Sequence, residues 1–421
     1  MTERLDWALG LVRHLESVAT TPELRTVYNA VQPKVSAFYS GIPLHEGLWK
    51  ALQRFEASQQ GKSLTGVKKR FLTKTMDSFR RAGAELDAAG KQKLQEIDIA
   101  LAEATTKFSQ HVLDSTNEFE LILEDESRLK GLPPSAIAAA RASAEAKGKP
   151  GWRFTLQAPS YLAVMTYMDD RATREQLYRA FNIRGTVAPH DNRELLVKIL
   201  DLRKQKAQML GFRDFADLVL HDRMAHTGAT AAAFLEDLRK KTESAFVREN
   251  QSLTEFAGLT LEPWDIGYWA EKQRAALYDF DEEVLRPYFP LDRVVEGMFS
   301  IFGELLGIQV VPEEGVPAWD KDVRTFAVRD AATGAHLGSF YSDWFPRENK
   351  RGGAWMDSFL TGNPAEGKPH LGLICGNLTP PVDGKPALLT HRDVETIFHE
   401  FGHLLQDRKS TRLNSSHVKR S

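Results

Sequence analysis

Apolar residues recur at helical spacing along residues 88–119, and this pattern predicts one long amphipathic helix. Helical patterns occupy most of the sequence from Arg4 to about Leu306, and residues 228–258 form a second segment long enough to cross a domain. Strand-like runs come only later, at 308–311, 325–328, 337–341 and 371–375. The sequence therefore predicts a mainly α fold with one small β-sheet near its C-terminal end.

A boundary between two regions is expected near residue 150. Residues 147–151 combine glycine, lysine and proline, which is typical of a surface loop. We therefore expect an N-terminal helical region at 1–150 and a second region at 151–406 that holds further helices and the sheet. The remaining residues, 407–421, form a basic tail that is poor in apolar residues.

Composition and charge exclude several classes of protein. The 55 Lys and Arg residues nearly balance the 57 Asp and Glu residues, which favours neither nucleic acid nor an anionic membrane as a partner. The longest uncharged stretch, 154–168, is too short and too polar to span a bilayer. The first residues do not resemble a secretory signal, and the single cysteine fits a reducing compartment. We expect a cytoplasmic protein.

The chemically informative segment is a helix expected to start after Thr390. Thr390 and Asp393 have the spacing of a capping box. Two histidines, His399 and His403, fall on the helix face opposite an apolar stripe. That stripe contains Val394, Ile397, Phe398, Phe401, Leu404 and Leu405. Histidines that point away from the packed face do not fit the role of satisfied core residues, although a solvated face with a chance match is an alternative.

The pattern His399-Glu400-Phe401-Gly402-His403 is an HExxH motif, which predicts a zinc site. Imidazoles at positions i and i+4 lie one above the other on a helix, so both can reach one Zn²⁺ ion. Glu400 lies to the side of that ion and is better placed to act as a general base than as a ligand. Zinc lowers the pKa of a bound water, and Glu400 would pass the proton of that water to the leaving amine.

These residues resemble the thimet oligopeptidase and oligopeptidase A family of zinc peptidases. Residues 347–356, Arg-Glu-Asn-Lys-Arg-Gly-Gly-Ala-Trp-Met, are nearly the family's second signature, although in isolation they would pass for a solvated charge run with a glycine turn. The segments 21–25 and 157–161 also match, and the resemblance extends to about Gln406.

The resemblance implies a two-lobed, mainly helical zincin-type oligopeptidase fold, with the small sheet beside the HExxH helix. The active site would lie on the floor of a deep channel that admits only short peptides. One zinc ion would be the cofactor, held by His399 and His403, with Glu400 as the catalytic residue. The strand that carries Leu371, Gly372 and Leu373 would be the sheet edge on which an extended peptide lies. We expect a monomer that binds neither nucleic acid nor a membrane.

This sequence departs from the family after Gln406. The family's third zinc ligand, a downstream glutamate, and its glycine-rich substrate loop have no counterpart here. We therefore expect an incomplete catalytic domain at 151–406, an artefactual tail and impaired hydrolysis. Asp407 or His417 is an unsupported substitute ligand, since Asp407 would lie about 12 Å along the helix axis from His399.

Three interpretations remain open at the level of the sequence. The chain is either a metalloendopeptidase, as the resemblance implies, or a non-catalytic helical peptide-binding module with a vestigial HExxH motif. Nucleic-acid binding through the basic tail is a third possibility, which the salt dependence of binding would test. We also expect the apolar stripe to lack some partners, which would leave exposed apolar surface near the HExxH helix.

Overall fold

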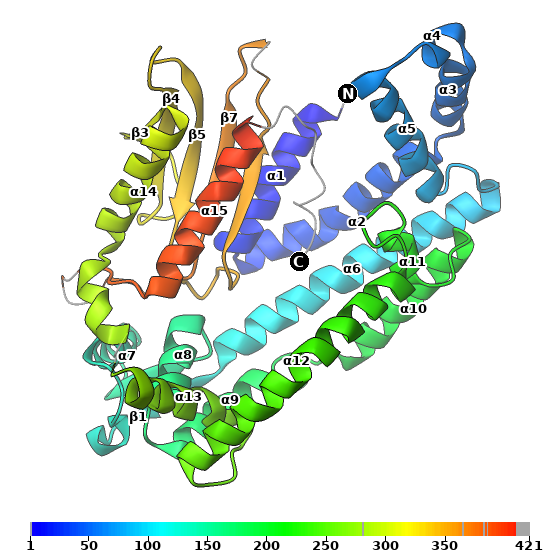
Figure 1. The fold of residues 1–421 in the computed structure, drawn as a ribbon. Coiled ribbons are helices and arrows are strands. Elements are labelled where there is room, and N and C mark those ends of the chain that lie inside the picture. Colours follow the sequence, from blue (N-terminus) through cyan, green and yellow to red (C-terminus); the bar gives the residue numbers. More distant parts are fainter. Residues whose placement is uncertain (1, 280–281, 364–365, 382–383, 385, 410–421) are drawn as a thin grey trace. The chain divides into compact units, whose positions relative to one another are not determined.

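The fold is given by a computed structural model that describes residues 2–279, 282–363, 366–381, 384 and 386–409 (Figure 1). The chain forms two compact units, and each is built from separate stretches of sequence. The first unit contains Met1–Pro22, Thr116–Ile183 and Leu253–Ser421, and the second contains Glu23–Ser115 and Arg184–Ser252. The division predicted at residue 150 stays a prediction, and most of the expected tail, residues 410–421, lies outside the described residues.

Helices and turns make up the described part of the second unit. Both long helices that the periodicity predicts are confirmed, as α6 (Ala88–Glu118) and α12 (Gly228–Ala257), although each extends a few residues beyond the unit. Its other helices are α2 (Pro22–Leu44), α3 (Glu46–Ala57), α4 (Gln59–Lys62), α5 (Gly66–Arg81), α10 (Arg193–Met209) and α11 (Phe215–Leu220).

The first unit combines helices with two sheets. A two-stranded sheet pairs β1 (Glu120–Leu123) with β2 (Trp152–Thr155), which corrects the expectation that strands occur only late in the chain. The helical elements are α1 (Glu3–Val18), η1 (Glu126–Leu129), α7 (Pro134–Glu145), α8 (Ala158–Tyr167), α9 (Arg171–Asn182), α13 (Pro263–Tyr278), η2 (Glu282–Tyr288), α14 (Leu291–Leu306) and α15 (His391–Lys409). The mainly α fold class is confirmed.

A mixed five-stranded sheet supports α15 and has the strand order β3-β4-β5-β7-β6. Its strands are β3 (Ile308–Glu313), β4 (Arg324–Asp330), β5 (His336–Asp343), β6 (Trp355–Leu360) and β7 (His370–Cys375). β4 and β5 form an antiparallel hairpin, whereas β7 runs parallel to β5 and antiparallel to β6. Because alternate residues of a strand face opposite sides of a sheet, β5, β6 and β7 each contribute to two separate cores.

One face of this sheet packs against α14 and α15, which lie along it in Figure 1. Phe326, Phe340 and Ile374 of the sheet are buried in the same cluster as Ile397 and Phe401. All six residues of the predicted stripe pack in this cluster, with Val394 and Phe398 partly buried. The expectation that the stripe lacks partners is therefore wrong, because α14 and the sheet cover it.

The opposite face of the sheet packs against α1. Val18 of α1 is buried with Leu373 and Cys375 of β7. His14, also on α1, lies edge-on to the rings of Trp319 and Phe359, with centroids 4.1 and 4.9 Å away. α1 is thus part of the core on which β6 and β7 rest.

Lys350 and Arg347, which belong to an apparently solvated charge run in the sequence, join a polar cluster around the buried Asp343 in the structure. Lys350 is buried and Arg347 is half-buried, whereas Glu348 and Arg351 of the same run are exposed. The Lys350 ammonium donates to the Asp343 carboxylate at 2.8 Å and to the carbonyl oxygens of Asp343, Phe345 and Gly376 at 2.9, 2.8 and 2.6 Å. Arg347 donates to both Asp343 oxygens at 2.9 and 2.6 Å. Lys350 therefore joins the carboxyl ends of the parallel strands β5 and β7.

Lowering the pH from 6.5 towards 4 is expected to destabilise the chain through His14. Burial lowers the pKa of His14 to about 4; the charge of Asp343 raises it, whereas the charges of Lys350, Arg347 and Arg351 lower it. The unfolded side chain has its ordinary pKa of 6.5, so it binds more protons than the folded side chain between these values. The stability due to this group is complete above pH 6.5 and falls by roughly 3 kcal/mol as the pH drops towards 4.

This expectation can be checked with urea unfolding curves between pH 4 and 7. His14→Phe should show a shallower loss of stability over that range than the unchanged chain. The difference between the two proteins isolates His14 from the carboxyl groups that titrate nearby. Parallel pH profiles for the two proteins would show that His14 does not make this contribution.

Candidate active site

A capping box starts the helix that carries the HExxH motif, as predicted. The Asp393 carboxylate accepts a hydrogen bond from the Thr390 N–H at 3.0 Å, and the Asp393 N–H donates to Thr390 Oγ1 at 3.1 Å. These two bonds satisfy N–H groups that have no partner within the helix. Together with the buried apolar stripe, they set the orientation of α15, so the opposite face is directed away from the core.

His399 and His403 lie together on this exposed face. Their Nε2 atoms are 3.1 Å apart, and their ring centroids are 4.6 Å apart. Helical geometry accounts for the pairing, since side chains four residues apart stack along one face. The structure therefore brings together the two histidines that the sequence singles out, with their Nε2 atoms side by side.

Glu400 lies on the other side of this pair, where α15 meets the sheet. It is only 8 % exposed. Burial raises the pKa of its carboxyl group, while the charges of His399 and His403 and the nearby backbone of Met356 lower it in part. The carboxyl is thus held between the histidine pair and the backbone of β6.

The histidine pair fits two ligands of one metal ion. Two nitrogens bound at about 2.0–2.1 Å to a tetrahedral zinc ion stand roughly 3.4 Å apart, which is close to the observed 3.1 Å. Within the part of the chain that the structure describes, no cluster of three His, Cys, Asp or Glu residues could hold a metal. His399 and His403 therefore supply two ligands of such a site. The side chains of Asp407 and His417, the substitute ligands considered in the sequence analysis, are not among those that the structure describes.

The predicted position of Leu371, Gly372 and Leu373 at the sheet edge is wrong. β7 pairs with β5 on one side and with β6 on the other, so its backbone groups are used within the sheet. Gly372 also faces α15, where a Cβ atom would clash with the Leu404 side chain. These residues support the HExxH helix, and β6 occupies the edge.

β6 is the element beside the site that the strand pattern does not reveal. The backbone of its Met356 lies near enough to the Glu400 carboxyl to lower the pKa of that group, and its Ser358 N–H bonds to the Asp357 carboxylate at 2.7 Å. The sequence of this strand, Trp-Met-Asp-Ser-Phe-Leu, has no regular alternation. The first residues of β6 fall within residues 347–356, the segment that resembles the second signature of the family. This overlap is the sequence signal that could have revealed the strand.

Among the described residues, every helix is too short or too polar to cross a membrane.

Two sequence families match this chain. Peptidase family M3 matches residues 164–420, and the N-terminal domain of neurolysin and thimet oligopeptidase matches residues 1–91. Oligopeptidase A of Haemophilus influenzae is 39 % identical over 415 residues, which cover 95 % of this chain and 61 % of that protein. Oligopeptidase A of Escherichia coli is 40 % identical over 406 residues, covering 93 % and 59 %. The dipeptidyl carboxypeptidase of Salmonella typhimurium is 31 % identical over 395 residues, covering 92 % and 58 %.

Solved structures share the fold at lower sequence identity. A putative oligoendopeptidase F from Bacillus anthracis has a TM-score of 0.53 at 12 % identity, covering 97 % of this chain and 59 % of that one. PZ peptidase A with an inhibitor has a TM-score of 0.52 at 14 % identity, covering 97 % and 57 %. This chain spans about three fifths of the length of the relatives it matches. The match to the M3 pattern over more than half of the sequence means that the chain belongs to peptidase family M3.

Proposed function

We propose that this chain carries the HExxH half of a zinc-dependent metalloendopeptidase that hydrolyses short oligopeptides. The observation that supports this most directly is the 3.1 Å approach of the His399 and His403 Nε2 atoms, with the buried Glu400 carboxyl between this pair and β6. The names of the relatives, oligopeptidase A among them, give peptides as the substrate class. A cytoplasmic, monomeric protein without nucleic-acid or membrane partners is part of the same proposal.

In this proposal, His399 and His403 hold the metal, which would act as a Lewis acid on the scissile carbonyl and on the attacking water. The Glu400 carboxylate accepts a proton from that water and then delivers it to the leaving amine nitrogen. Burial raises the pKa of Glu400, which brings it closer to the pH at which it must both accept and release a proton.

An extended peptide would lie along β6, since this strand forms the edge of the sheet. The Ser358 N–H of this strand already bonds to the Asp357 carboxylate, so we expect a peptide to pair with the other outward-facing backbone groups of β6. With two described ligands, the chain as it stands is expected to be impaired as a catalyst.

Zinc titration against a competing chelator tests the metal part of this proposal. We expect one ion to bind through the two histidines, far more weakly than at a three-ligand site, because a third ligand would add both charge and geometry. His399→Ala and His403→Ala should each abolish the remaining binding. His391→Ala, which changes an exposed histidine at the start of the same helix, is the matched control.

Two results would count against the proposed metal site. Equal zinc affinity of the His399→Ala variant and the unchanged chain would show that the histidine pair does not bind the metal. Tight, stoichiometric binding that survives Asp407→Ala and His417→Ala would mean that a described residue supplies the third ligand. Saturable peptide binding without any zinc binding would favour the non-catalytic module instead.

A further inference from the structure

The middle of α12 is exposed to solvent on every side, from residue 232 to residue 244. Every residue of this helix is described, and only Leu253 is buried. Leu253 lies beyond the part of α12 that belongs to the second unit. The start of the helix is held by α11, because the Asp217 carboxylate accepts a hydrogen bond from the Gly228 N–H at 2.7 Å. Within the second unit, α12 is therefore anchored at its beginning and uncovered along its length.

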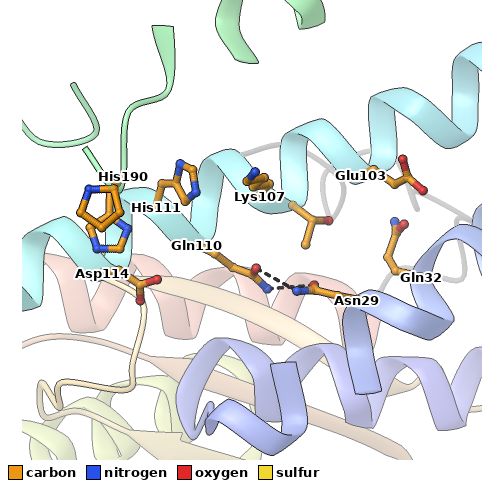
Figure 2. Close-up of a pocket in the computed structure, with 10 residues that line it drawn as sticks. Asn29, Gln32, Glu103, Lys107, Gln110, His111, Asp114 and His190 are labelled. Atoms are coloured by element: carbon orange, nitrogen blue, oxygen red, sulfur yellow. Dashed lines mark hydrogen bonds between the residues drawn. The ribbon is translucent and has the colours of Figure 1, made fainter. Parts of the chain in front are cut away.

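α6, the other long helix of this unit, is packed. It buries Leu94, Ile97 and Ala104. Its polar side meets α2, where Asn29 and Gln110 exchange amide hydrogen bonds of 3.2 and 3.1 Å, drawn as dashed lines in Figure 2. Two helices of similar length in one unit thus differ in whether their sides are covered.

The sequence of α12 does not suit a helix that water surrounds. At 100° per residue, four large apolar side chains fall within about 120° of the helix circumference. They are Phe234, Leu235, Leu238 and Phe246, and between 47 % and 67 % of each is exposed. At 1.5 Å per residue, this stripe is about 18 Å long. A helix with an apolar stripe normally buries it against a partner.

The remaining circumference of α12 is charged and needs no partner. Arg239 donates to Glu236 at 2.9 Å and to Glu243 at 3.0 Å. Lys241 pairs with Asp237 at 2.7 Å. Charges one helical turn apart stabilise a helix face that stays in solvent. The exposed apolar stripe is therefore the one side of α12 whose chemistry asks for cover.

The comparison with relatives points to the occupant of this stripe. The matched part includes the family's N-terminal domain, at residues 1–91, and covers about three fifths of oligopeptidase A. The other two fifths of those proteins therefore follow on the C-terminal side. The stripe of α15 is already covered within this chain, whereas that of α12 is not. A segment joined to the same chain reaches such a surface at a higher effective concentration than a second copy does.

We propose that the apolar stripe of α12 is the docking surface for the C-terminal segment of an M3 peptidase, through a helix that carries an apolar stripe of its own. A partner helix of about 12 residues spans the distance from Phe234 to Phe246. Docking removes both stripes from water, which is the driving force for the contact. It needs neither the metal nor catalysis, so its test is independent of the proposed function.

Thiol labelling tests this proposal, because the single cysteine of the chain, Cys375, is buried. Leu238→Cys places a reactive thiol in the stripe, and Lys240→Cys places one on the charged side as the matched control. Both variants are labelled with a maleimide as they are, and again with the C-terminal segment of an oligopeptidase A relative, either fused to the chain or added as a separate polypeptide. We expect the segment to slow labelling of Leu238→Cys at least tenfold and to leave Lys240→Cys unchanged.

A carboxylate in the stripe provides a second measurement. Phe246→Glu should restore fast labelling of Leu238→Cys in the presence of the segment, since a charge buried in an apolar contact has no partner. Val247→Glu, the same kind of change on the same helix but outside the stripe, should not.

Three results would overturn the docking surface. The first is labelling of Leu238→Cys that is equally fast with and without the segment in both arrangements. The second is equal protection of Lys240→Cys, which would mean that the cover is not specific to the stripe. The third is labelling of Leu238→Cys in the chain alone that slows as protein concentration rises, which would assign the stripe to a second copy.

Discussion

Glu400→Gln is expected to slow peptide hydrolysis by a factor of about 10²–10⁴ while leaving metal binding intact. The amide has nearly the shape of the carboxylate, but it cannot accept a proton from the attacking water. The measurement uses a quenched fluorescent peptide and a chain extended by the C-terminal segment of an oligopeptidase A relative, because this chain spans about three fifths of those proteins. Metal content is determined for each variant at the same time.

The histidine variants provide the contrast for this experiment. His399→Ala and His403→Ala should lose the metal together with the activity, whereas Glu400→Gln loses the activity alone. A folded protein offered as substrate should remain uncut, since an extended peptide is what can lie along β6. Activity of Glu400→Gln within about tenfold of the unchanged enzyme, or equal cleavage of folded protein and peptide, would refute the assigned mechanism.

Lys350→Met is expected to lower the free energy of unfolding by about 3–5 kcal/mol, the usual cost of removing one partner of a buried ion pair. The Lys350 and Asp343 side chains are 0 % and 1 % exposed. Burial alone would raise the pKa of Asp343, but the hydrogen bonds from Arg347 and Lys350 outweigh it and hold that pKa below its ordinary value. Methionine would leave the carboxylate and three carbonyl oxygens without this donor.

Urea unfolding of the unchanged chain and two variants measures this effect. Lys147→Met is the matched control, because Lys147 forms an ion pair with Glu348 in which both side chains are more than 40 % exposed. A surface pair of this kind contributes about 0–1 kcal/mol. A loss in Lys350→Met no larger than that in Lys147→Met would mean that the buried cluster adds little to stability.

Local sequence patterns determined the features of this protein that depend on neighbouring residues. The periodicity of residues 88–119 and 228–258 anticipated α6 and α12 to within a few residues at each end. The capping box at Thr390 and the histidine pair on α15 were also predictable, because each follows from the fixed geometry of one helix. The chemistry of the candidate site could therefore be predicted from the sequence, whereas the elements that surround the site could not.

The tertiary structure decided which side chains are buried and which strand lies at the edge. Sheet order depends on pairing between distant segments, so the apolar run at Leu371–Leu373 proved to be interior while β6 took the edge. The same holds for Lys350, whose acceptors come from the end of β5 and from the loops that follow β5 and β7. A lysine in a charged run reads as solvated unless distant carbonyl oxygens converge on it, and only the folded chain brings them together.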